Sequence, residues 1–394
     1  MMLLKNKNIA IIGGGPGGLT LARLLQLKGA NVKVYERDFN REVRVQGATL
    51  DLHAETGLKA LDEAALMDAF KANYRPDNDK LRVLDEDLNI IYDQHAEIDS
   101  VDFGHEHFRP EIDRGPLRDI LLDSLKPDTV VWNSHIISLE SVDQSWKITF
   151  QNGSTAIADI VIGADGANSK IRKYVTPIKP FYTGVTVLIG NIPFSEKNAP
   201  TLHELLKGGK VMALGASKTI SLSEKGDGSL DFYIGYHKDE NWSVTSGIDF
   251  NDNAQVLNWF KDEFAGWNSD WHELFATEGV MFIPRPLYCM PLDQTWDAQP
   301  NITIIGDAAH LMPPYAGEGV NMAMLDALQL SESLSDNRFT SLRSAIANYE
   351  KQMFVRFSEM GKITLDNTDA MHSSEGKESL LKIIGLAQND DHSK

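Results

Sequence analysis

Cysteine is nearly absent from this chain of 394 residues, in which Cys289 is the only one. A single cysteine excludes an internal disulfide, a redox-active cysteine pair and a cysteine-rich metal site. Basic residues are also in deficit, because 38 Lys and Arg stand against 56 Asp and Glu and leave a formal net charge of −18. We therefore expect no nucleic-acid partner, since a phosphate backbone carries the same sign of charge.

Long hydrophobic runs are missing as well. No apolar stretch approaches the roughly 20 residues that cross a bilayer, and the first segment, MMLLKNKN, is too short for a secretory signal peptide. We expect a cytoplasmic protein without a membrane contact. The chain length predicts two domains, or one large α/β domain with an insertion, and 42% hydrophobic residues are enough for a core.

A glycine motif lies close to the N-terminus. Residues 9–12 are apolar and predict a strand buried on both faces, and the sequence GGGPGG that follows matches GxGxxG with Gly13, Gly15 and Gly18. In this pattern the first glycine permits a tight turn, the second lets the backbone approach a pyrophosphate, and the third lets helix pack on strand. The helix that begins near Pro16 offers free N–H groups and the positive end of its dipole to phosphates.

An acidic residue follows at the expected distance. A second predicted strand, 32–35, ends at Glu36, which lies 18 residues after Gly18. A carboxylate at this place commonly accepts hydrogen bonds from the ribose of a dinucleotide. The sequence therefore predicts a dinucleotide site, and the alternative is a glycine-rich turn without a ligand.

Two later stretches also place polar loops after buried strands. The strand 160–163 precedes Asp165 and Gly166, and the strand 302–305 precedes Gly306 and Asp307. Open α/β folds bind ligands at this edge of the sheet, so we expect both loops to lie near one. A plain strand–turn–helix is the alternative for the first loop. For His310, in the second loop, we favour a packing role over a catalytic one.

The middle of the chain has a different pattern. Strand-like pieces recur between residues 171 and 284 with turn signals between them, which predicts an antiparallel sheet. Aromatic residues between 256 and 271 follow a helical stripe that we interpret as core. Residues 57–72 read as one helix. His105 and His107 lack a clear third ligand, so we predict no metal site.

The three motifs, in this order and at these distances, resemble the class A FAD-dependent aromatic hydroxylases, the group of para-hydroxybenzoate hydroxylase. Finer features, VYERD, GATLDLH and GDAAHLMPPYAGEGVN, are similar to the Tet(X)-type tetracycline-inactivating flavin monooxygenases. The resemblance covers nearly the whole chain. It implies an α/β fold in which a Rossmann-like FAD-binding domain of the GR2 type is interrupted by an antiparallel-sheet substrate domain and followed by a long C-terminal helix. The implied boundaries are 1–72, 103–170 and 285–340 for the FAD-binding domain, 73–102 and 171–284 for the substrate domain, and 341–394 for the helix and tail.

The resemblance also assigns site residues. Contacts to non-covalent FAD are implied for Gly13, Gly15, Pro16, Gly17, Gly18, Glu36, Arg37, Asp51, Arg114, Arg118, Asp165, Asp307, Pro314, Gly317, Glu318, Gly319, Val320 and Asn321. Arg44 matches the family arginine associated with NADPH. Contacts to the substrate are implied for Ile189, Lys210, Asp231, Pro314, Tyr315 and Gly317.

The substrate residues depart from the tetracycline enzymes. Ile189, Lys210 and Asp231 stand where those enzymes carry glutamine, arginine and histidine. Tyr315 replaces a phenylalanine, and Glu318 replaces a glutamine. The residues that face the flavin are kept while those that face the substrate are changed, so the sequence does not single out tetracycline.

The implied function is a monooxygenase that uses NAD(P)H and O2 to hydroxylate a fused-ring phenol or enol, with tetracycline-type antibiotics as the leading candidate. FAD carries this chemistry, and we assign no catalytic side chain. The alternatives are a hydroxylase of an unrelated aromatic metabolite, a flavin-dependent reductase or halogenase-like enzyme, and a flavin-binding redox sensor. We expect a monomer; the sequence does not distinguish NADH from NADPH.

Overall fold

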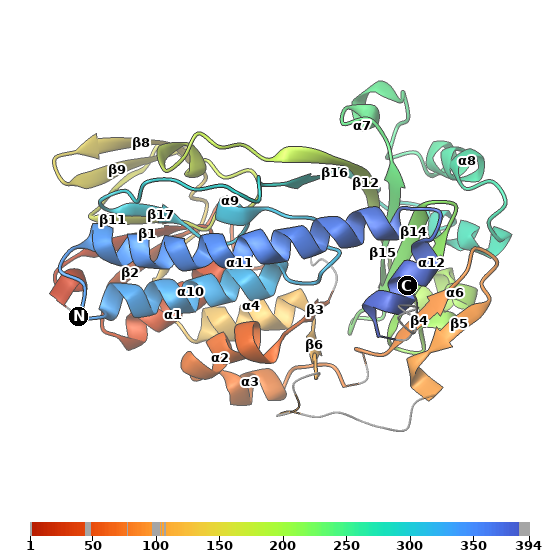
Figure 1. Ribbon diagram of the computed structural model, residues 1–394, viewed down its shortest axis with the longest axis horizontal. Helices are drawn as coiled ribbons and strands as arrows, with labels where there is room; N and C mark the ends of the chain where they lie inside the picture. Colours follow the sequence, from red (N-terminus) through yellow and green to blue (C-terminus); the bar gives the residue numbers. More distant parts are fainter. Residues whose placement is uncertain are drawn as a thin grey trace, which may run out of the picture.

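Figure 1 gives the computed structural model of the chain, which describes residues 2–43, 49–76, 78–96, 103, 105 and 108–385. Two large sheets and one long helix organise it, so the predicted α/β architecture with a second, antiparallel sheet and a long C-terminal helix is confirmed. None of the helices in the described ranges combines the length and apolar composition that a bilayer crossing requires.

The first sheet is parallel and five-stranded, with the order β17-β11-β1-β2-β7. Its strands are β17 (Ile302–Ile304), β11 (Ile160–Gly163), β1 (Asn8–Ile12), β2 (Asn31–Tyr35) and β7 (Val130–Val131). The central strand β1 is buried at every position after Asn8, as its apolar run predicts. The glycine turn and the two later polar loops all follow strands of this sheet, so they meet at its carboxyl edge.

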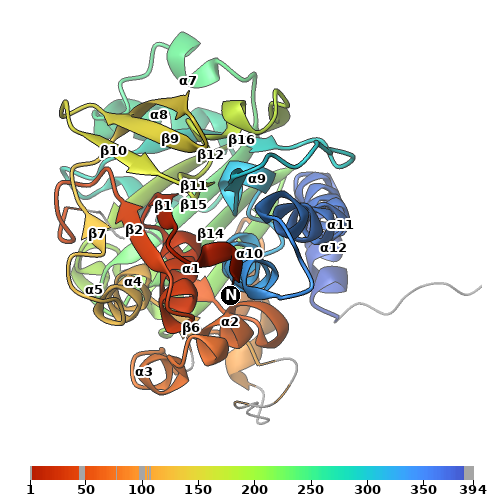
Figure 2. The ribbon, with the colours of Figure 1, turned by 90° about the vertical axis from the view of Figure 1, so that its left-hand side faces the viewer.

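Helices and a smaller sheet cover the two faces of the parallel sheet. In Figure 2, α1 (Pro16–Leu27) and α10 (Gly319–Ser335) lie side by side on one face. The three-stranded sheet β10-β9-β8 lies on the other face. Its strands are β8 (Ile136–Val142), β9 (Ser145–Phe150) and β10 (Thr155–Ala158).

The second large sheet has seven strands in the order β16-β12-β15-β14-β13-β4-β5. They are β16 (Ile283–Cys289), β12 (Phe181–Ile192), β15 (Leu230–His237), β14 (Lys218–Glu224), β13 (Lys210–Gly215), β4 (Leu81–Leu84) and β5 (Ile90–Asp93). All neighbours are antiparallel except β13 and β4. The strands β4 and β5 therefore join a sheet whose other members follow residue 180.

The strand register separates the two faces of this sheet. Leu188, Ile234, Ile220 and Ala213 form one cross-strand row, which is buried in a core cluster with α6 (Pro200–Leu206) and α8 (Asn253–Glu263). The aromatic stripe at 256–271 is buried in the same cluster, which confirms its interpretation as core. Alternate residues face the opposite side, toward the end of the long helix.

The polar residues of that opposite face also form rows. Asn191, Asp231, Ser223 and Lys210 are aligned across four strands. The next row holds Ile189, Tyr233, Ser221 and Met212. Three of the six residues predicted to contact substrate, Ile189, Lys210 and Asp231, therefore share one face of one sheet.

The long helix α11 (Leu342–Met371) spans both parts of the molecule in Figure 1. It begins with a capping box at Ser341 and packs along α10. The following helix α12 (Gly376–Ile383) packs against β13 of the seven-stranded sheet. The C-terminal segment thus contacts elements of both large sheets.

The prediction of one helix over residues 57–72 is wrong. The chain forms η2 (Ala54–Leu58), α2 (Lys59–Glu63) and α3 (Met67–Lys71) instead. The break lies at Ala65, whose φ of +57° ends α2 before Leu66 returns to the core. The remaining elements are η1 (Met2–Leu4), β3 (Leu50–Asp51), η3 (Gln94–Ala96), β6 (Glu111–Ile112), α4 (Arg114–Asp123), η4 (Arg172–Tyr174), α5 (Ser195–Asn198), α7 (Trp242–Thr245), η5 (Ser269–Phe275) and α9 (Asp307–His310).

Candidate functional site

The glycine turn between β1 and α1 is shaped by two close backbone contacts. A Cβ on Gly13 would lie 2.3 Å from the carbonyl oxygen of Ala164, and a Cβ on Gly18 would lie 2.2 Å from that of Gly13. A Cβ on Gly15 would meet nothing within 4 Å, and this residue precedes α1 without a side-chain cap. The turn therefore offers open backbone at Gly15 and uncapped N–H groups, which fits a pyrophosphate.

Glu36 reaches this turn from the end of β2. Its carboxylate accepts hydrogen bonds from the N–H of Gly14 at 2.5 Å and of Asp38 at 3.0 Å, and the residue is 2% exposed. Arg37 is exposed at the same edge. The predicted acid is thus fixed in orientation next to the glycine turn.

The second loop is held by its own residues. Asp165 accepts hydrogen bonds from the Ser169 hydroxyl and the Lys170 N–H, both at 2.6 Å. Its carboxylate stabilises the turn, and a contact to a cofactor through Asp165 stays a prediction. Sequence reasoning missed Arg172, which donates to the carbonyl oxygens of Asp307 and Ala308 at 2.7 Å and so joins the second loop to the third.

Asp307 has an unusual environment in the third loop. Its side chain is accessible to solvent, and no hydrogen bond or ion pair to its carboxylate occurs within the described part of the chain. Protein atoms still surround it closely enough that desolvation raises its pKa, while His310 and, to a smaller extent, Arg114 at the start of α4 oppose this rise. A recessed carboxylate without a protein partner suits a ligand hydroxyl or N–H group.

His310 has a packing role in this loop, as predicted. It is 1% exposed, its Nε2 lies 2.5 Å from Oδ2 of Asp326, and its ring stacks on Phe357. The same Asp326 oxygen accepts the N–H of Gly306 at 2.8 Å. The pair of His310 and Asp326 therefore stabilises the third loop from its buried side.

The segment 313–321, called the 313–321 loop below, lies against β3. Gly317 has a φ of +69°, and a Cβ there would lie 3.2 Å from Oδ2 of Asp51. The buried Asn321 donates to the carbonyl oxygen of Asp51 at 2.9 Å and accepts the N–H of His53 at 3.0 Å. A Cβ on Gly319 would meet nothing within 4 Å, so the loop is fixed on one side and has open backbone at the start of α10.

His53, which sequence reasoning also missed, bridges two carboxylates. Its Nε2 lies 2.9 Å from Oδ2 of Asp51, and its Nδ1 lies 2.9 Å from Oε1 of Glu318. Burial alone would lower the pKa of His53, but the two carboxylates raise it to about 9. The only sequence signal is its position two residues after Asp51 in GATLDLH.

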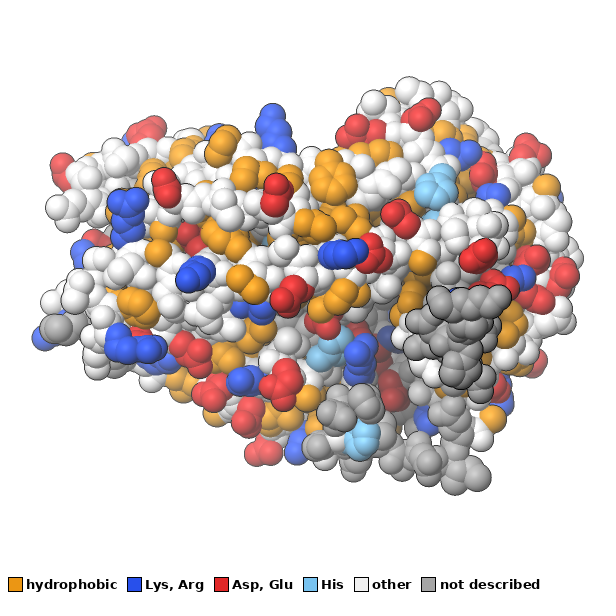
Figure 3. Space-filling model, in the orientation of Figure 1, with side chains coloured by type: hydrophobic (Ala, Val, Ile, Leu, Met, Phe, Trp, Pro, Cys, Tyr) orange, Lys and Arg blue, Asp and Glu red, His pale blue; other side chains and the backbone are white. Residues whose placement is uncertain are grey.

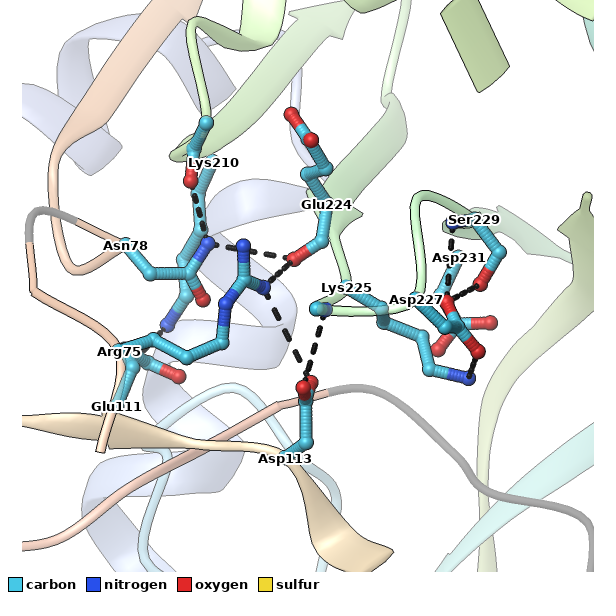
Figure 4. Close-up of polar contacts among 12 residues, drawn as sticks. Arg75, Asn78, Glu111, Asp113, Lys210, Glu224, Lys225, Asp227, Ser229 and Asp231 are labelled. Atoms are coloured by element: carbon cyan, nitrogen blue, oxygen red, sulfur yellow. Dashed lines mark hydrogen bonds and ion pairs between the residues drawn. The ribbon is translucent and has the colours of Figure 1, made fainter. Parts of the chain in front are cut away.

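Lys210 extends this charged group. Figure 4 shows its side chain pointing from β13 toward Glu111, with which it forms an ion pair, while Asp231 lies at the other end of the drawn network. Lys210 also lies close to Asp51. Glu111 is 1% exposed and pairs with Asp51 through the β3–β6 backbone. Lys210 therefore lies beside the 313–321 loop and is already engaged by protein carboxylates.

Asp231 is turned into the protein. It is 3% exposed and accepts a hydrogen bond from Asn191 at 2.7 Å, while its second oxygen has no partner in the described ranges. Desolvation raises its pKa. Ile189 is half-buried in the neighbouring row. Of these three strand residues, Lys210 lies close to Asp51, which in turn lies beside the 313–321 loop.

Tyr315 connects the same loop to the long helix. Its hydroxyl lies 3.2 Å from Nε2 of His372, whose Nδ1 lies 2.8 Å from the carbonyl oxygen of Thr368 and so carries the proton. Burial lowers the pKa of His372 to about 4, which keeps the ring neutral as an acceptor. A Cβ on Gly235 would lie 2.6 Å from both partners, so only glycine leaves room for this pair.

A shallow hollow lies beside the loop after β2. It has a volume of about 300 Å³ and is lined by Arg41, Glu42, Gly115, Arg118 and Asp119. The buried Arg118 donates to Asp38 at 3.1 Å and to the carbonyl oxygen of Arg41 at 2.9 Å, which fixes one wall. Arg44, predicted to contact NADPH, lies outside the described residues.

The surface of the protein carries charges of both signs. On the face shown in Figure 3, acidic and basic side chains are interspersed and no continuous patch of Lys and Arg occurs. Within the described residues, no three His, Cys, Asp or Glu side chains are arranged to hold a metal ion.

The FAD binding domain family matches residues 6–207 and 294–352 of the chain. The monooxygenase penA of Penicillium thymicola is 27% identical over 95% of this chain and 98% of its own length. The HpxO protein of Klebsiella pneumoniae, solved with FAD and uric acid, superposes with a TM-score of 0.75 at 20% identity, over 97% of this chain and 93% of its own. The tetracycline destructase Tet(51) superposes with a TM-score of 0.68 at 19% identity, over 98% and 99% of the two chains. The two solved structures show the shared fold.

Proposed function

This chain belongs to the FAD binding domain family, and from that membership we propose that it is an FAD-dependent monooxygenase. The proposed reaction consumes NAD(P)H and O2 and hydroxylates a fused-ring phenolic or enolic small molecule. Relatives that carry the name monooxygenase and match nearly their whole length support the reaction class. The observation that supports the proposal is Asp307, whose accessible carboxylate has no hydrogen bond or ion pair within the described residues and lies at the edge of the sheet where the glycine turn opens.

The residues present fit FAD. The turn at Gly15 can take the pyrophosphate on open backbone, and Glu36 is oriented to accept from the adenosine ribose. Asp307 can accept from a hydroxyl of the ribityl chain. The 313–321 loop, with open backbone at Gly319, can lie against the ring system. When bound, FAD supplies the redox chemistry and the activation of O2, and the protein orients it and excludes water.

The proposed substrate site lies between the 313–321 loop and the face of the seven-stranded sheet that carries Ile189 and Lys210. Pro314 is exposed and Tyr315 is held by His372, so the loop offers a flat floor. A flat polycyclic molecule fits such a floor, and tetracycline-type antibiotics remain the leading candidate.

A second candidate is an aromatic metabolite with fewer polar groups. Ile189 offers no hydrogen bond, Lys210 is paired with Glu111, and Asp231 is 3% exposed and bonded to Asn191. Each polar contact that a ligand cannot make in a buried site costs about 1–3 kcal/mol. These internal pairs favour a substrate that relies on apolar contact.

The test combines cofactor binding with isotope transfer. Purified protein should be yellow and release intact FAD on denaturation. Incubation with NADPH, labelled O2 and tetracycline should yield a product whose mass has gained one labelled oxygen. Protein that binds no FAD after reconstitution contradicts the proposal, and NADPH oxidation without oxygen transfer to any aromatic candidate favours the redox-sensor alternative.

A further inference from the structure

The contacts that His53 makes within the protein determine the charge of its ring. Both ring nitrogens lie 2.9 Å from a carboxylate oxygen, Nε2 from Asp51 and Nδ1 from Glu318. A neutral imidazole has one N–H, so it can donate to only one of these two acceptors. The side chain is 11% exposed, which limits screening by water. His53 is therefore an imidazolium that donates to both carboxylates.

The two carboxylates belong to segments that are far apart in the sequence. Asp51 ends β3, and Glu318 precedes α10 in the 313–321 loop, 265 residues from His53. Asn321 adds a second connection, because its side chain bonds the backbone of both Asp51 and His53. The loop is thus tied to β3 by one charged and one neutral contact.

The charges near His53 are nearly balanced. Asp51, Glu318 and Glu111 are carboxylates, and His53 and Lys210 are the cations that contact or lie close to them. Loss of the His53 charge would leave Glu318 without this cation and would leave Asp51 with Lys210 alone, which also pairs with Glu111, beside the proposed site of an anionic dinucleotide. Repulsion would then oppose both the loop conformation and the ligand.

We propose that His53 is a positioning residue that locks the 313–321 loop to β3 and cancels the charge of Asp51 and Glu318 at the flavin site. This inference rests on the proposed function, because it assigns the loop to FAD. His53 itself acts through the two carboxylates and touches no reacting atom.

The test separates charge from packing. His53→Gln keeps a polar side chain but removes the cation, and it should weaken FAD binding by about tenfold or more, as expected for a lost charge-assisted hydrogen bond. The double variant His53→Gln with Glu318→Gln removes one uncompensated carboxylate and should recover several-fold of that loss. A purely structural role predicts no such recovery. FAD affinity is measured by titrating apoprotein and following flavin fluorescence.

Two further variants complete the test: the first is a control, and the second changes one partner of His53. His203→Gln changes a histidine on α6 that contacts Ser195 at 3.0 Å, on the far face of the seven-stranded sheet, and should leave FAD affinity unchanged. Glu318→Gln alone leaves His53 with one carboxylate partner, so the FAD affinity of this variant should be lost at a lower pH than that of the wild type as pH rises. Circular dichroism identifies any variant that fails to fold.

The outcomes are distinguishable. Wild-type protein that binds FAD, together with a folded His53→Gln variant that binds it equally well, overturns the role of His53 and leaves the proposed function intact. A double variant no better than the single one also overturns it. Wild-type apoprotein that binds no FAD overturns both proposals.

Discussion

Two regions differ in how their polar groups are engaged by the protein. One is the carboxyl edge of the parallel sheet, and the other is the face of the seven-stranded sheet that carries Ile189, Lys210 and Asp231. At the parallel sheet, Gly15 and Gly319 leave backbone open, and the accessible carboxylate of Asp307 has no partner among the residues that the structure describes. On the seven-stranded sheet, Lys210 pairs with Glu111 and Asp231 with Asn191. The first region presents open backbone and a carboxylate without a partner in the described residues, while the charged groups of the second region are engaged by protein side chains, although one oxygen of Asp231 lacks a partner there.

This difference explains why motifs in the sequence predict the dinucleotide site but not the contacts on the seven-stranded sheet. A pyrophosphate needs close backbone approach and a helix start, so its requirements are met by glycines at fixed spacing. Recognition on a sheet face depends on which side chains lie opposite each other across strands. That pairing depends on register and tertiary contacts, which no short motif records.

The largest effects are expected in the glycine turn, where substitution of Gly18 should lower both stability and FAD binding and substitution of Gly15 should lower FAD binding alone. Gly18→Ala places a Cβ 2.2 Å from the carbonyl oxygen of Gly13, so the apoprotein should lose on the order of 1–3 kcal/mol of stability and bind FAD poorly. Gly15→Ala meets no protein atom within 4 Å, so it should keep the apoprotein's thermal midpoint yet weaken FAD. Thermal unfolding and FAD titration of both variants measure this. Equal loss of stability in the two would contradict the assignment of Gly15 to a ligand.

Alkaline pH should weaken the connection between β3 and the 313–321 loop. The folded pKa of His53 is raised to about 9 from an unfolded value near 6.5. Its stabilisation, on the order of 3 kcal/mol, is therefore complete below about pH 6.5 and is lost as pH rises through 9. Urea unfolding of wild type and His53→Gln from pH 6 to 10 gives this difference directly. A difference that does not change with pH would show that His53 is neutral in the folded protein.

Asp307→Ala should weaken FAD binding without changing the stability of the protein. The carboxylate has no partner in the described part of the protein, so its removal should leave the circular-dichroism spectrum and thermal midpoint unchanged. A lost charge-assisted hydrogen bond should weaken FAD by about tenfold to a hundredfold. Glu36→Ala should weaken FAD to a similar extent but also cost stability, because Glu36 bonds two backbone N–H groups. FAD bound as tightly by Asp307→Ala as by the parent would contradict the assignment of the third motif.

Tyr315→Phe should have the opposite effect, a loss of stability with little change in FAD affinity. It removes the hydroxyl that donates to the buried Nε2 of His372 and leaves only the longer contact of 3.5 Å to the Thr219 hydroxyl, so a loss of about 1 kcal/mol is expected. FAD affinity should stay within a few-fold, because the ring and the loop backbone remain, with Asn367 still donating to the Tyr315 carbonyl. Urea unfolding and FAD titration are compared. A strong loss of FAD without loss of stability would place the hydroxyl at the cofactor.

The smallest effect is expected at Lys210. Lys210→Arg keeps the charge, and its guanidinium can still pair with Glu111, so turnover of tetracycline should change little. Ile189→Gln adds a hydrogen-bonding group to a half-buried position and should increase turnover if tetracycline is the substrate. Tetracycline absorbance is followed with enzyme and NADPH. Fast wild-type turnover that Ile189→Gln does not improve would contradict the alignment of Ile189 with a polar contact of the tetracycline enzymes.

Much of the fold follows from local patterns. The buried strand, glycine turn and helix at residues 9–25 occur as predicted because each needs only its own periodicity and spacing. The break in the helix at Ala65 could not be predicted, because the apolar stripe continues past Ala65, which has a positive φ, to the buried Leu66. His53, Arg172 and the pair of Tyr315 with His372 require contacts between segments far apart in the chain.

The central claim is that the edge of the parallel sheet is a cofactor site completed by FAD. The most direct measurement is a titration of wild-type apoprotein with FAD, followed by flavin fluorescence. The account predicts saturable binding of one FAD per chain, with a sharp endpoint. Fluorescence that stays that of free FAD throughout the titration, with the apoprotein folded, would contradict it.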